Sequence, residues 1–316
     1  MQIKSPIFCI PRELRDHIYT YYVYEEDGYF HDFASGKLTR SHQQPIDLGL
    51  TFTCKPIAKE LRGLALRINQ ITFTTGRSED DDNTPHDEYR GFRSRAGRYE
   101  SLLALTRVAK MQMLMHASEC ITPAVLRQIE ERHAEDGSFF TDHFRATCEY
   151  GPIGSFEDSL EGFVGYMTKD ASEVPPSFRS ALDTALTLAS ADPRFTSLAR
   201  KAFDKDLNSP KWRTIFRSKA FDLVLKWQPA PWHIPSSNEL SMLEALLSDP
   251  DEAIHHSYRG EWGAQTDYSV GVWYFSATAV AIELLKRLST RGLRACNIVI
   301  QEDRKAVAHP AYHARD

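Results

Sequence analysis

Apolar residues recur at helical spacing along most of this chain, and prolines repeatedly stand where such runs begin. Helices are predicted after Pro123, Pro176, Pro193 and Pro210. A proline is tolerated in the first helical turn because its missing N–H would have no partner there. Apolar residues at i, i+3, i+4 and i+7 line one face of a helix, and this signal dominates from residue 99 to residue 250. The chain is therefore expected to build a helix-rich fold.

Short strands are expected toward the two ends of the chain. Residues 28–40 alternate with a period of two around a turn at Gly36, which predicts a hairpin. One helix is predicted over 55–68 and is followed by a strand at 71–75, while a second helix over 277–288 precedes a strand at 293–300. The predicted fold class is α+β and helix-rich, with N-terminal helices and short strands, a central helical region and a C-terminal helix–strand unit.

A break in charge separates the N-terminal region from the central helices. Residues 79–88 hold six acidic residues, and residues 90–98 hold four arginines. Such a self-neutralising run is typical of a surface loop. The predicted domains are an N-terminal module over 1–76, a charged loop over 77–98 and a helix-rich domain over 99–316.

Composition excludes several classes of protein. Hydrophobic residues make up 42% of the chain and charged residues 26%, which is ordinary globular composition. No apolar run is long enough for a secretory signal or a membrane span. The five cysteines are widely spaced without a CxxC pair, which favours reduced thiols in a cytoplasmic or nuclear protein. A net charge of −5 disfavours nucleic acid as a partner of the whole surface.

Two N-terminal passages carry a family resemblance. Residues 10–19, IPRELRDHIY, resemble the "LPxELRxxIY" opening of a large set of fungal F-box-like proteins. Residues 50–60 together with 69–73 resemble the second element of that set, "LLxTCRxIxxE…NxFxF". Residues 274–300, with 302–304 and 309–315, resemble its tail. The chain has Ile10 where leucine is usual and Lys55 where arginine is usual, and it stops at Asp316, where the tail usually continues.

The resemblance implies an interaction protein rather than an enzyme. An F-box-like element docks on a Skp-type adaptor subunit of a ubiquitin ligase. Carried over onto this chain, the partner-binding residues would be Pro11, Leu14, Ile18 and Tyr19. Leu14 and Ile18, with Tyr21 or Tyr22, also fall at i, i+4 and i+7 on one face of a predicted helix.

Two other functions stay open at the level of sequence. The first is an enzyme of unfamiliar type whose site draws on four residues of the central region, His133, Asp142, His143 and Glu149. Neither a nucleophile motif nor a phosphate loop is present, no metal site is favoured and no cofactor is expected. The second alternative is nucleic-acid or chromatin binding through the aromatic-flanked arginines of residues 89–99, namely Arg90, Arg93, Arg95 and Arg98.

Overall fold

The structure is a computed structural model, and it confirms a helix-rich α+β fold with a small sheet. It describes residues 6–76, 95–134, 137, 140–142, 144, 176–203, 216–230, 232–248 and 275–303. Two further predictions from the sequence fall outside these residues wholly or for the most part. They are a helix start at residues 155–158, which resemble a capping box, and a strand over 268–275.

The N-terminal module starts with the predicted helix and hairpin. Helix α1 (Arg12–Val23) begins directly after Pro11, whose φ of −49° suits a helix start. Strands β1 (Tyr29–Asp32) and β2 (Lys37–Thr39) pair antiparallel and form the predicted hairpin. Gly36 closes the turn at φ +65°, in the left-handed region that glycine adopts readily.

The single helix predicted over 55–68 is wrong, because the structure breaks it in two. Helix α2 (Lys55–Leu61) and helix α3 (Leu64–Ile68) are separated at Gly63, which adopts φ +72°. A left-handed residue cannot continue a right-handed helix, and glycine is the residue that takes this conformation without strain. Apolar spacing alone continued across the break, so periodicity did not reveal it. Strand β3 (Gln70–Thr74) follows, as expected.

The central region contains six described helices that match the predicted ones to within a few residues at most ends. They are α6 (Arg95–His116), α7 (Pro123–Arg132), α10 (Pro176–Ala189), α11 (Phe195–Ala199), α12 (Phe221–Lys226) and α13 (Ser237–Glu244). Thr122, just before Pro123, caps α7, since its side chain accepts a hydrogen bond from the Val125 N–H. Helix α11 ends before the predicted end at Leu207 and passes into a short 3-10 turn over Arg200–Phe203. The helix predicted from Pro210 to Trp227 is wrong in its extent, because Phe216 forms a β-bridge with Leu247 and α12 begins only at Phe221.

The two ends of the chain meet in one mixed sheet. Strand β4 (Asn297–Gln301) pairs in parallel with β3 from Gln70↔Asn297 to Thr74↔Gln301, and the strand order is β2-β1-β3-β4. Helix α15 (Ala277–Thr290) shares a core cluster with this sheet through Val280 and Leu284, which are buried together with Ile71 and Phe73. The sequence interpretation grouped residues 275–303 with the helical region, whereas the structure pairs them with the first 76 residues.

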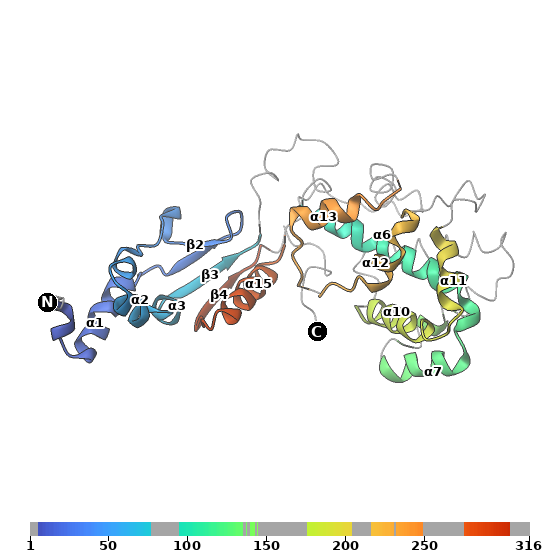
Figure 1. Ribbon diagram of the computed structural model, residues 1–316, viewed down its shortest axis with the longest axis horizontal. Coiled ribbons are helices and arrows are strands. Elements are labelled where there is room, and N and C mark those ends of the chain that lie inside the picture. The colour runs from blue at the N-terminus through green and yellow to red at the C-terminus, as the bar shows by residue number, and fades with distance from the viewer. Residues whose placement is uncertain are drawn as a thin grey trace.

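Figure 1 shows this arrangement directly. The blue N-terminal elements and the red α15 and β4 lie together at one end of the molecule, and α6 to α13 lie at the other. The Gly76 N–H donates to the Phe275 carbonyl oxygen at 2.7 Å, so the outgoing and returning chains meet at one crossing point. The central helices are thus an insertion between β3 and α15.

Glu302 ties the returning segment to the sheet. Its carboxylate accepts hydrogen bonds from the N–H groups of Ala277 and Thr278, at 3.0 and 3.1 Å, and from the Thr75 hydroxyl at 3.4 Å. A carboxylate at a helix N-terminus satisfies unpaired N–H groups and complements the helix dipole. The same side chain therefore caps α15 and links it to the end of β3.

We expect Glu302→Ala to lower the free energy of unfolding by about 1–2 kcal/mol, the usual cost of losing a helix cap. Urea denaturation followed by circular dichroism measures the change. Gln301→Ala is the matched control, because Gln301 is the exposed neighbour and caps nothing in the described structure. Equal stability of the two variants would contradict the capping role.

Candidate docking surface on the first helix

Helix α1 has one face that packs against the module. Tyr19 is fully buried and Val23 nearly so, and both join a small core cluster with Ile57 and Leu61 of α2. This cluster is separate from the large core that runs through the sheet and the central helices. Few fully buried residues therefore hold α1 in position, and partly buried apolar residues and polar contacts add to them.

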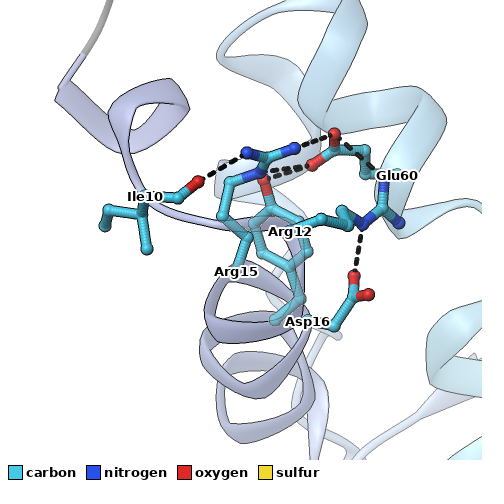
Figure 2. Close-up of polar contacts among 6 residues, drawn as sticks. Ile10, Arg12, Arg15, Asp16 and Glu60 are labelled. Carbon is cyan, nitrogen blue, oxygen red and sulfur yellow. Dashed lines mark hydrogen bonds and ion pairs between the residues drawn. The ribbon is translucent and has the colours of Figure 1, made fainter.

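A polar network fastens α1 to α2, and Figure 2 shows it at close range. The Arg15 guanidinium donates to both carboxylate oxygens of Glu60, at 2.8 and 3.2 Å, and to the Ile10 carbonyl oxygen at 2.8 Å. The Tyr19 hydroxyl donates to Glu60 at 2.8 Å, and Arg12 lies 3.0 Å from the same carboxylate. The hydrogen bond from Arg15 lowers the pKa of Glu60, so this carboxylate stays charged in the folded protein.

The opposite face of α1 is apolar and exposed. Leu14 is 54% exposed, Ile18 42% and Tyr21 83%, and these residues stand at i, i+4 and i+7. We call this set, Leu14, Ile18 and Tyr21, the outer face of α1. Side chains at this spacing lie on one side of a helix, and an amphipathic helix that binds a groove presents anchors at these positions.

The four residues that the resemblance implied as partner-binding differ in their exposure to solvent. Pro11, Leu14 and Ile18 are exposed, so they are accessible to a partner. Tyr19 is fully buried and bonded to Glu60, so it holds α1 in place and does not reach a partner in this arrangement. Tyr21, which the helical spacing offered as an alternative to Tyr22, takes its place on the outer face.

Sequence reasoning did not single out Phe52 as an exposed aromatic residue. Phe52 is 79% exposed at the end of the 3-10 turn over Gly49–Phe52. Phe52 belongs to the second family-like element, residues 50–60. Exposure of a single side chain in a short turn has no periodic signature, so no pattern in the sequence marked it.

The residues of the enzyme hypothesis are not drawn together by the described structure. The His133 Nε2 atom lies 2.9 Å from the Thr184 hydroxyl oxygen, and burial lowers the pKa of His133. Asp142 is exposed, and His143 and Glu149 lie outside the described residues. His133 therefore has a structural contact that links the end of α7 to α10.

Two of the four arginines considered for nucleic acid make intramolecular contacts. The Arg98 guanidinium donates two hydrogen bonds to the Glu244 carboxylate, at 2.7 and 2.6 Å. Arg95 donates to the Pro235 carbonyl oxygen at 2.9 Å, and its guanidinium lies 5.2 Å from the ring centre of Phe33. Both contacts join α6 to neighbouring segments. Arg90 and Arg93 lie outside the described residues.

The described residues show neither a metal-binding cluster nor a membrane-spanning helix. Within that part of the chain, no group of three or more His, Cys, Asp or Glu residues could hold a metal ion. None of the described helices combines the length and the apolar character that crossing a membrane requires.

Comparison with known proteins adds no relative. No family model matches this chain, and no curated protein or solved structure matches it either. The resemblance to F-box-like proteins therefore rests on the quoted N-terminal and C-terminal residues alone.

Proposed function

We propose that this protein is a protein–protein interaction module that docks through the outer face of α1 onto a Skp-type adaptor subunit of a ubiquitin ligase. The observation that carries the proposal is the exposure of Leu14, Ile18 and Tyr21 on a helix whose other face is fixed. The choice of adaptor comes from the resemblance of residues 10–19 to the F-box-like opening.

The energetics of the helix favour docking over a purely structural role for these residues. Removing a leucine or isoleucine side chain from water contributes about 1.5–3 kcal/mol, and Leu14 and Ile18 leave a large part of that unrealised in the free protein. Meanwhile Arg15, Tyr19 and Glu60 hold the backbone of α1 in place. A pre-ordered helix loses little conformational entropy on binding, so its apolar anchors contribute more fully to affinity.

The test is co-purification with a recombinant Skp-type adaptor. We expect Leu14→Asp to weaken adaptor binding at least about tenfold, because the variant places an unpaired charge in an apolar contact. Thr20→Asp is the matched control, since Thr20 is exposed on another side of the same helix and receives the same charge.

Both variants are expected to keep the wild-type circular dichroism spectrum, because both replaced side chains are exposed. Equal adaptor binding by folded Leu14→Asp and folded wild-type chains would overturn the proposed surface. Failure of the folded wild-type chain to bind any adaptor would overturn the proposed partner.

A further inference from the structure

Strand β4 forms one edge of the sheet. It is the last strand in the order β2-β1-β3-β4, and no strand in the described part of the chain pairs with its outer side. A regular edge strand presents a row of N–H and C=O groups that can pair with another chain. All five residues of β4 pair with β3, so the strand is regular along its whole length.

The other edge of the sheet is protected in ways that β4 is not. Strand β2 has three residues, starts with Lys37, and ends at Thr39, which forms a bridge with Pro45. Short length, lysine and proline are devices that prevent edge-to-edge pairing. Strand β4 has five residues and contains neither a charged residue nor a proline.

Apolar side chains continue from the buried sheet onto this edge. The register pairs Ile71 with Ile298 and Phe73 with Ile300, so each isoleucine extends a buried row on the same face of the sheet. Ile298 is 39% exposed and Ile300 40% exposed. A neighbouring strand on this side would complete the cover of both side chains.

The sequence of β4 is complementary to itself. It reads Asn297-Ile298-Val299-Ile300-Gln301, which is nearly unchanged when reversed. If two copies pair antiparallel around Val299, Ile298 of one lies opposite Ile300 of the other, and Asn297 lies opposite Gln301. A two-fold symmetric interface requires this property, because the same patch must match itself.

We propose that a second copy of this chain pairs antiparallel with β4 through a two-fold axis at Val299. The two sheets then become one eight-stranded sheet, and four isoleucines form an apolar cluster at the junction. The inference is independent of the α1 docking surface, which lies on a different element of the module (Figure 1).

The first test changes the charge of the edge. The full chain is expected to show concentration-dependent dimerisation in sedimentation velocity. The double variant Ile298→Lys/Ile300→Lys is expected to dissociate at least about tenfold more readily, because the lysines of the two chains face one another. The variant Ile298→Glu/Ile300→Glu is expected to behave in the same way.

Mixing the Lys double variant with the Glu double variant is the decisive experiment. The introduced lysines and glutamates then face each other, so dimerisation is expected to return in the mixture alone. Circular dichroism of each variant verifies the fold. A wild-type chain that stays monomeric at high concentration would overturn the proposal, and so would a folded mixture that stays monomeric.

The second test measures register. Val299→Cys, in a background with Cys296→Ser, is expected to form a cross-linked dimer under mild oxidation, because directly opposed residues of antiparallel strands have Cα separations that suit a disulfide. The Lys double variant carrying the same cysteine should not cross-link. Cross-linking that persists in that variant would contradict the proposed pairing.

Discussion

Replacing Lys110 with methionine is expected to lower the free energy of unfolding by about 3 kcal/mol. Lys110 lies on α6 and is nearly buried, and its Nζ atom donates to Asp183 of α10 at 2.5 Å and to the Trp227 carbonyl oxygen at 2.7 Å. Removing one partner of a buried pair leaves the other charge without compensation, which typically costs about 3–5 kcal/mol. The Asp183 side chain is still 20% exposed, so water can partly solvate its charge. We therefore expect a loss of stability at the lower end of this range.

A double variant shows whether the unpaired charge of Asp183 causes this loss of stability. The double variant Lys110→Met/Asp183→Leu removes both charges, and we expect it to recover most of the lost stability. Urea denaturation followed by tryptophan fluorescence measures all three proteins. A double variant as unstable as the single one would show that the loss reflects packing around α6 rather than an unpaired carboxylate.

Acidification is expected to destabilise the sheet through His31. This residue of β1 is 7% exposed, and neither of its ring nitrogens has a hydrogen-bond partner among the described residues. Burial, with a smaller contribution from the positive charge of Arg287, lowers the pKa of His31 to about 4, while Asp32 opposes the shift. The ring packs against Phe73 with centres 5.4 Å apart, so protonation would place a charge against the core.

The direction of the pH effect follows from the lowered pKa. Between the unfolded pKa of 6.5 and the folded value of about 4, the unfolded chain binds the proton and the folded chain does not. The contribution of neutral His31 is therefore complete above pH 6.5 and is lost as the pH falls toward 4. From about pH 7.5 to about pH 5, we expect a loss of about 2 kcal/mol from this residue.

His31→Phe isolates this contribution, because phenylalanine retains a flat ring and does not titrate. The variant should lose about 2 kcal/mol less than the wild-type protein over the same pH interval. Carboxylates with lowered pKa values, such as Asp32 and Glu60, remain ionised there and do not interfere. Identical pH profiles of the free energy of unfolding would show that His31 is not the group responsible.

Local sequence signals predicted most of the elements but not how they assemble. Pro123 and Pro176 mark the starts of helices that the structure contains, because helix starts depend on a few neighbouring residues. The pairing of β3 with β4 joins residues more than 200 positions apart. No local pattern specifies such a partner, and so the C-terminal unit was grouped with the central helices.

The sequence predicted only part of the candidate docking surface, again because a distant contact decides the rest. Helical spacing placed Leu14 and Ile18 on one face of α1, but it did not say whether that face is buried or exposed. The orientation of α1 follows from Arg15 and Tyr19, which both bind Glu60 of α2. Glu60 lies 45 residues after Arg15 and 41 residues after Tyr19 in the sequence. This contact turns Tyr19 inward and leaves Leu14, Ile18 and Tyr21 outside.

The most direct test of the proposed function is a calorimetric titration of a purified Skp-type adaptor into the full chain. We predict saturable binding that is lost in Ile18→Asp and retained in Thr20→Asp, with both variants folded by circular dichroism. Absence of binding to the folded wild-type chain, or equal binding by all three proteins, would contradict the assignment of the outer face of α1 as the docking surface.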